Sequence, residues 1–157
     1  MNPCPCGHLG SPLHACRCTP DQVARYQGRL SGPLLDRIDL HIEVPAIAPQ
    51  ELLEASAGEP SGAVRERVIK ARARAISRQG HPNQAMQGAA IDTHAALEDG
   101  PRTLLHRAAT KWGWSSRATH RVLKVARTIA DLAGTEQVEA GHLAEAMQYR
   151  SVRFGTI

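Results

Sequence analysis

Four cysteines near the start of the chain are its clearest candidates for chemistry. All the cysteines of the 157-residue sequence form two Cys-x-Cys pairs: Cys4, Cys6, Cys16 and Cys18. Four thiolates can hold a tetrahedral zinc ion and thereby staple a loop that is too short to build a core. The usual knuckle is Cys-x2-4-Cys, so a one-residue gap strains simultaneous ligation. Zinc binding, free structural thiols and redox use all stay open, and His8 and His14 are either substitute ligands or ordinary loop histidines.

The expected compartment bears on these cysteines. The sequence has no run of about eighteen apolar residues that would span a bilayer, and no basic region followed by an apolar segment at its N-terminus. We therefore expect a cytoplasmic protein without membrane contact. Because thiols are kept reduced in the cytoplasm, clustered cysteines there favour metal ligation over disulfides.

Basic residues offer a second kind of chemistry, which is contact with phosphate. The net charge is +4 and the pI is near 9.2, and residues 101–130 hold seven Arg or Lys and no acid. Arg117, Arg121 and Lys124 follow one another at i, i+4 and i+7, which places them on one side of a predicted helix. This pattern predicts a nucleic-acid contact, with an ordinary solvated helix face as the alternative.

Three further side chains have two interpretations each. Arg37 stands between two acids in "LLDRID", where it forms either a surface ion pair worth about 0–1 kcal/mol or a contact with phosphate oxygens. Trp112 and Trp114 either stack on bases or anchor a helical core.

The elements that position these residues are predicted to be mainly α-helical. Hydrophobic residues make up 42% of the chain but aromatics only 3%, so the core must be built from Ala, Leu, Val and Ile in closely packed helices. Helical patterns cover residues 20–30, 63–80, 101–112, 115–134 and 139–150, with a turn of helix near 92–97. Alternation over residues 38–44 predicts one half-buried strand, which needs sheet partners from elsewhere.

Proline and glycine mark a boundary in the middle of the chain. Residues 46–62 are rich in both and predict a linker. The domain organisation predicted from the sequence is therefore residues 1–45, this linker, and a four- or five-helix bundle over 63–157.

Three segments carry a family resemblance: "MNPCPCG…CRCTP", "RLSGPLLDRIDLHIEVP" and "SSRATHRVLKVARTIADL…HLAEAMQYR". Together they resemble the C-terminal part of the magnesium-chelatase-like AAA+ ATPases of the ComM (YifB) type, over essentially the whole chain. The resemblance implies that residues 1–45 are the end of an ATPase core with a cysteine-rich insertion, and that 63–157 are its helical lid. It also implies a hexameric ring that uses ATP and Mg²⁺ and acts on DNA in branch migration during uptake and recombination.

The resemblance also assigns roles to single residues. Asn2 matches the sensor-1 asparagine that orients the attacking water, Arg37 the arginine finger, and Arg117 the sensor-2 arginine of the lid. The sequence contains no G-x4-G-K-[ST] loop, so we expect the phosphate-binding loop and magnesium-binding acids upstream, and no turnover by this chain alone. The alternatives are a nucleic-acid or protein binding module that works without nucleotide, and a chelatase subunit acting in porphyrin metallation.

Overall fold

The computed structural model describes residues 1–150, and these fall into two compact units that divide between Gly58 and Glu59. Helices and one short 3-10 turn are the regular elements within the described part of the chain, which contains no strand. The prediction of a mainly α protein is therefore confirmed. Residues 151–157, with which the predicted helical domain ends, lie outside the described residues.

Short helices make up the regular structure of the first unit. Helix α1 (Pro20–Gln27) begins with a capping box in which the Thr19 hydroxyl accepts from the Gln22 amide, while the Gln22 side chain accepts from the Thr19 amide. This reciprocal pairing satisfies two backbone donors at the helix start. Two shorter helices follow, α2 (Gly32–Leu35) and α3 (Pro49–Glu54).

The strand predicted over residues 38–44 is wrong. This segment has neither helix nor strand structure, and Ile42 and Val44 are 64% and 84% exposed. Its alternating pattern lacks a neighbouring strand among residues 1–150, and an isolated strand cannot satisfy its own backbone hydrogen bonds.

The second unit is a bundle of helices. Its elements are α4 (Ser61–Gln79), the 3-10 turn η1 (Asn83–Ala85), α5 (Ala89–His94), α6 (Asp99–Trp112), α7 (Ser116–Ala133) and α8 (Ala140–Gln148). The Ser115 hydroxyl accepts from the Ala118 amide at the start of α7, so Ser115 is the N-cap of this helix. Helix α7 is central to the unit because it contacts α4, η1, α5 and α8.

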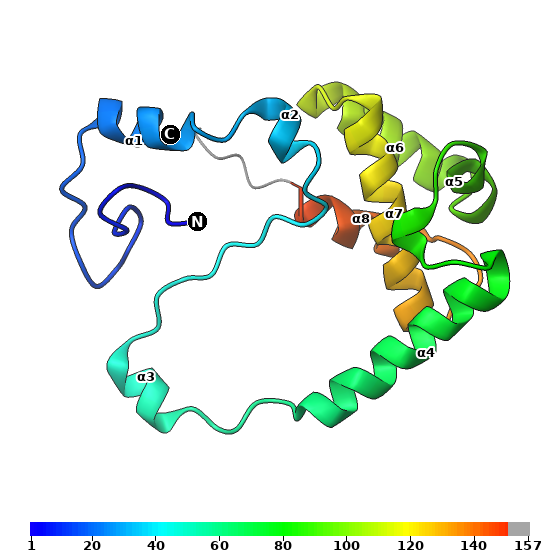
Figure 1. Cartoon of the computed structure of the whole chain (residues 1–157), viewed down its shortest axis with the longest axis horizontal. Coiled ribbons are helices and arrows are strands. Elements are labelled where there is room, and N and C mark those ends of the chain that lie inside the picture. Colours follow the sequence, from blue (N-terminus) through cyan, green and yellow to red (C-terminus); the bar gives the residue numbers. More distant parts are fainter. Residues whose placement is uncertain (151–157) are drawn as a thin grey trace. The chain divides into compact units, whose positions relative to one another are not determined.

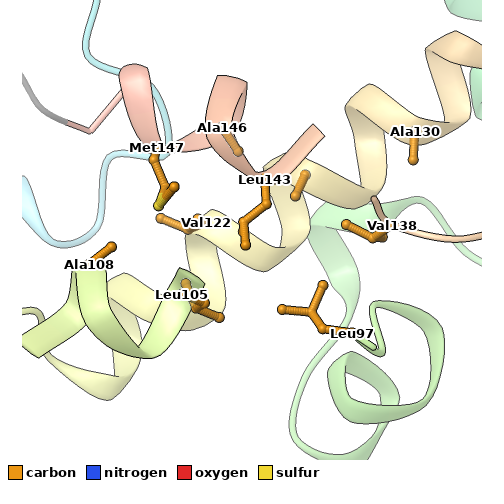
Figure 2. Packing of buried hydrophobic residues seen from close by; sticks show 10 residues of the cluster. Leu97, Leu105, Ala108, Val122, Ala130, Val138, Leu143, Ala146 and Met147 are labelled. Atoms are coloured by element: carbon orange, nitrogen blue, oxygen red, sulfur yellow. The ribbon is translucent and has the colours of Figure 1, made fainter. Parts of the chain in front are cut away.

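A core of small and aliphatic side chains holds α6, α7 and α8 together. Val122 and Leu143 are essentially inaccessible to solvent at 1% and 0% exposure. Figure 2 shows side chains from the three helices meeting there. The buried members are Leu97, Leu105, Ala108, Val122, Ala126, Ala130, Val138, Leu143, Ala146 and Met147. We call this set the main core.

The helical spacing of Val122, Val125, Ile129 and Leu132 predicts an inward face of α7, but Leu132 is 45% exposed. On α4, Val64, Val68, Ala71 and Ala75 share one face by spacing; Ala71 and Ala75 are buried, whereas Val64 and Val68 are 37% and 52% exposed. The reason is that the first half of α4 extends away from the other helices of its unit, as Figure 1 shows, so only its second half has a surface to pack against.

Across residues 1–150, no helix combines the length and the hydropathy that crossing a bilayer requires.

Candidate metal centre and candidate phosphate contacts

The four cysteines of the first unit converge on one point. The Sγ atom of Cys4 lies 3.4 Å from that of Cys6 and 3.7 Å from that of Cys16, and the last two are 3.6 Å apart. With Cys18 included, all four Sγ atoms lie within 4.8 Å of one another, and none is in a disulfide. The one-residue spacing that was expected to strain ligation therefore does not keep the paired thiols apart.

The backbone around the cysteines holds this arrangement. A turn is closed by the Gly7 amide donating to the Cys4 carbonyl at 3.0 Å, with Gly7 at a φ of +83° that disfavours other residues. The Cys18 amide donates to the Cys16 sulfur at 3.5 Å. Gln27 of α1 donates to the Pro3 carbonyl at 2.9 Å, which ties the cysteine loop to the helix that follows it. The loop is thus fixed at several points without a core of its own.

The sulfur spacing fits a tetrahedral metal. Zinc bonds thiolate sulfur at about 2.3 Å, which places neighbouring sulfurs of a regular tetrahedron about 3.8 Å apart. The three Sγ separations of 3.4–3.7 Å are close to this value. Among the His, Cys, Asp and Glu side chains of residues 1–150, the four cysteines are the group that lies close enough together to hold a metal ion. Neither His8 nor His14 belongs to this group. The two imidazoles instead contact each other edge to face, with ring centroids 5.0 Å apart.

The cysteines also differ strongly in acidity. Backbone hydrogen bonds with Arg17 and His8, together with the Cys4 thiol, lower the pKa of Cys6 to about 6. A backbone hydrogen bond with Cys6 favours the Cys18 thiolate, but burial and the other three thiols outweigh it and raise the pKa of Cys18 to about 12. The cluster therefore loses its first proton readily but keeps another to high pH. Sulfurs packed this closely are expected to behave in this way, because they cannot carry several negative charges without a cation.

The predicted finger residue Arg37 lies directly after α2. Its backbone amide donates to the Leu34 carbonyl at 2.9 Å, and its side chain is exposed. No ion pair of Arg37 is present among the described residues. Asn2 is also exposed, and its side chain lies against the turn at Gly7. Both residues belong to the first unit.

The basic residues predicted on α7 have different surroundings. Arg117 is exposed in the first turn of the helix, whereas Arg121 and Lys124 are partly buried. Lys124 Nζ donates to the Gln84 carbonyl of η1 at 3.0 Å. All three residues lie on α7, and Lys124 also ties this helix to the adjacent turn.

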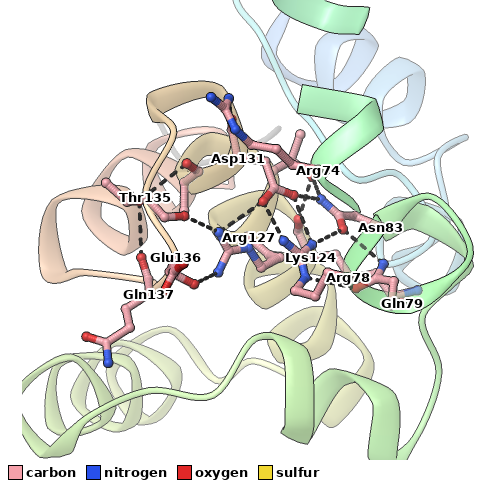
Figure 3. A network of polar contacts seen from close by, with 12 residues as sticks. Arg74, Arg78, Gln79, Asn83, Lys124, Arg127, Asp131, Thr135, Glu136 and Gln137 are labelled. Carbon is pink, nitrogen blue, oxygen red and sulfur yellow. Dashed lines mark hydrogen bonds and ion pairs between the residues drawn. The ribbon is translucent and has the colours of Figure 1, made fainter. Parts of the chain in front are cut away.

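A buried polar network between α4, η1 and α7 was not predicted (Figure 3). The Asp131 carboxylate accepts from Arg78 at 2.6 and 3.0 Å, from Asn83 at 2.8 Å and from Arg127 at 3.0 Å. Arg127 also donates to the carbonyls of the α7–α8 loop at 2.6 and 2.7 Å. Arg127 and Asp131 are each 1% exposed. Their i, i+4 spacing was the available sequence signal, but the partners on α4 and η1 lie about fifty positions away.

The charges in this network stabilise one another. Burial by itself would raise the pKa of Asp131, but hydrogen bonds from Arg78 and Asn83 and the charge of Arg127 lower it below its usual value. Burial lowers the pKa of Arg127, and the Asp131 carboxylate opposes that effect. The arrangement is a structural clamp between helices, since every one of these groups is engaged within the fold.

Comparison with known proteins identifies the family. Residues 58–150, more than half of the chain, match the family described as magnesium chelatase, subunit ChlI C-terminal. The chain belongs to this magnesium chelatase family. Residues 1–52 match a second description, magnesium chelatase, subunit ChlI. The predicted resemblance is therefore confirmed for residues 1–52 and for residues 58–150.

Curated relatives support the same assignment to the magnesium chelatase family. The chain is 46% identical to the competence protein ComM of Haemophilus influenzae over 154 residues. This alignment covers 97% of the chain and 30% of that relative. It is 43% identical over 153 residues to the protein YifB of Salmonella typhimurium, with the same coverage of both chains. The chain thus spans about a third of the length of these relatives.

Proposed function

We propose that this chain forms the late part of an AAA+ ATPase core and the helical lid of a ring-shaped motor that acts on DNA. The observation that carries the proposal is the 46% identity to the competence protein ComM along 97% of the chain. In this proposal the subunits assemble as a hexamer in the cytoplasm, and ATP and Mg²⁺ bind to core elements that residues 1–150 do not include. Residues 1–45 then belong to the core, 46–62 link it to the lid, and 63–157 form the lid.

Arg37 is proposed as the finger that reaches the γ-phosphate of a neighbouring subunit. A finger must be exposed and uncommitted before assembly, since its partner is on another polypeptide. The exposed side chain of Arg37 supports this role, as does the absence of an ion pair to it among residues 1–150. A guanidinium at this position would neutralise charge that develops on the transferring phosphoryl group.

Two other residues are proposed to serve the same reaction. Asn2 would orient the attacking water, and Arg117 would bind the nucleotide from the lid. Both side chains are exposed and so accessible to a ligand. Phosphoryl transfer depends mainly on positioning and on charge stabilisation, which an amide and a guanidinium can supply.

We further propose that zinc occupies the cysteine cluster formed by Cys4, Cys6, Cys16 and Cys18. The sulfur spacing near the tetrahedral value and the lowered pKa of Cys6 support it. A bound zinc ion would neutralise the thiolates and hold the loop rigid. Free thiols or redox use would instead leave the loop held by its hydrogen bonds alone.

DNA is proposed as the substrate, through branch migration during uptake and recombination. The printed name of the relative from Haemophilus influenzae links that protein to competence, and the acid-free run over residues 101–130 gives this chain a surface suited to phosphates. Arg121 and Lys124 are the proposed contacts. The alternatives are a binding module that works without nucleotide and a subunit acting on a porphyrin.

Hydrolysis of ATP by rings of full-length subunits tests the proposal. Arg37→Ala should leave nucleotide binding nearly intact but slow hydrolysis on the order of 10³-fold, because the finger acts mainly in the transition state. Arg29→Ala is the matched control, since Arg29 is an exposed arginine of the same unit. Normal hydrolysis by the Arg37→Ala ring would remove the catalytic basis of the proposal.

A further inference from the structure

The two tryptophans of the chain meet at the turn between α6 and α7. Trp112 is the last residue of α6 and Trp114 lies in the turn, and their ring centroids are 5.1 Å apart with the planes inclined by 38°. Both pack against the main core but stay partly exposed, unlike the buried Leu105 and Ala108 on the same helix. The pair therefore presents aromatic surface to solvent in addition to anchoring the core.

The turn holds the two rings in a fixed arrangement. Gly113 ends α6 with a φ of +63°, a conformation that favours glycine, and this reverses the chain between the two tryptophans. The Trp114 amide donates to the Ala109 carbonyl at 3.0 Å, which closes the turn. A platform of this kind loses little conformational entropy when a ligand binds to it.

A cation already lies over one of the rings. Lys111 Nζ is 6.0 Å from the centroid of Trp112, at the outer limit of a cation–π contact. Because Lys111 is exposed and its contact with the ring is this long, a planar group from solvent can compete with the ammonium for this face of the indole. Such a group could replace the ammonium, which would remain at the edge of the site.

The surroundings of the pair are basic. Arg107 and Lys111 are both exposed and stand at i, i+4 on α6, so they form a short cationic row that ends beside Trp112. No Asp or Glu occurs between residues 100 and 130. Aromatic faces next to cations are the combination that binds single-stranded nucleic acid, because bases stack on the rings while phosphates contact the charges.

We propose that the α6–α7 turn is a stacking platform for single-stranded DNA. A base displaces the Lys111 ammonium from the face of Trp112 and stacks there, beside Trp114, and the adjacent phosphates bind Lys111 and Arg107. The inference rests on the proposed action on DNA and names the surface that contacts the unpaired strand. It also adds a site at the end of α6 to the contacts proposed for Arg121 and Lys124 on α7.

Fluorescence of the unaltered 157-residue chain tests this platform without any substitution. Trp112 and Trp114 are its only tryptophans, so an oligothymidylate that stacks on them should quench the emission in a saturable way. A duplex of the same length, whose bases are not available for stacking, should quench much less. The quenching titration also yields the affinity for comparison with the variants.

Substitutions then separate the contribution of base stacking to the affinity from the contribution of charge. Trp112→Leu keeps an apolar side chain against the core and should weaken oligothymidylate binding about tenfold, whereas Trp112→Phe should restore much of the affinity. Lys111→Ala should weaken binding and reduce the salt dependence by about one counterion. The matched control is Arg72→Ala, which removes an exposed arginine from α4 and should change affinity far less. Anisotropy of a labelled oligonucleotide measures binding, and circular dichroism checks the fold.

Three results would overturn the platform. These are no binding of the oligonucleotide, binding without quenching, and equal affinity of the Trp112→Leu and unaltered proteins. Loss of binding in Arg121→Ala but not in the tryptophan variants would place the strand on α7 and leave DNA as the substrate. The ATPase proposal fails separately, if hydrolysis is insensitive to Arg37.

Discussion

Replacing Asp131 by alanine should destabilise the second unit more than any exposed substitution. The Asp131 carboxylate is 1% exposed and accepts hydrogen bonds from Arg78, Asn83 and Arg127. Its removal leaves Arg127 buried with an unpaired charge, and Asn83 without one of its acceptors. Breaking a buried pair in this way costs about 3–5 kcal/mol, which is a large part of the roughly 5–15 kcal/mol that stabilises an ordinary domain.

This loss of stability is measured by urea and thermal unfolding, with the helical circular dichroism signal as the readout. For a unit of this size, about 3–5 kcal/mol corresponds to a fall in Tm on the order of 12–40 °C. The control is Asp99→Ala, because Asp99 is fully exposed and its contact with Arg102 is 3.8 Å long. That exposed pair should contribute about 0–1 kcal/mol.

The stability lost in Asp131→Ala should also depend on pH. The pKa of Asp131 in the folded chain lies below its ordinary value of 3.8. A carboxyl group with a lowered pKa stabilises the fold above its unfolded pKa, and this contribution disappears as the pH falls through the folded pKa. The difference in stability between the unaltered protein and Asp131→Ala should therefore be full near neutral pH and shrink below about pH 4. A loss below about 1 kcal/mol at neutral pH would refute the view that this network clamps α4 to α7.

Three further predictions concern other parts of the chain. Protein purified under reducing conditions should carry about one zinc ion per chain by metal analysis, and Cys4→Ser should abolish it; metal-free protein from zinc-rich cultures would favour plain thiols. Backbone amides of residues 42–44 should exchange with solvent quickly, since these residues are exposed and no strand pairs with them within residues 1–150, and strong protection would contradict the assignment. Arg121→Ala and Lys124→Ala should each weaken DNA binding and reduce its salt dependence by about one counterion, and unchanged salt titrations would count against both contacts.

Features that depend on local sequence could be predicted well. Ser115 caps α7 because a serine hydroxyl reaches an amide three residues later, whatever the rest of the fold. The cysteine cluster was also predicted, since its four members lie within fifteen positions of one another.

Features that depend on partners distant in the sequence could not be predicted. The alternation over residues 38–44 is a strand pattern, but it forms no strand among the described residues because pairing requires a neighbour. Val64 and Val68 continue the apolar face of α4, yet nothing of the second unit covers that half of the helix. The Asp131 network combines residues from three elements, and only its Arg127–Asp131 part follows a helical spacing.

Mixing of two inactive subunit types tests the central claim most directly. Full-length subunits with Arg37→Ala would be combined with subunits that lack the lysine of their phosphate-binding loop, and ATP hydrolysis would be measured across mixing ratios. If Arg37 acts on the nucleotide of a neighbouring subunit, some interfaces of the mixed ring join an intact finger to an intact pocket, and activity should rise above that of either preparation alone. Full hydrolysis by the unmixed Arg37→Ala ring, or no recovery at any ratio, would contradict the account.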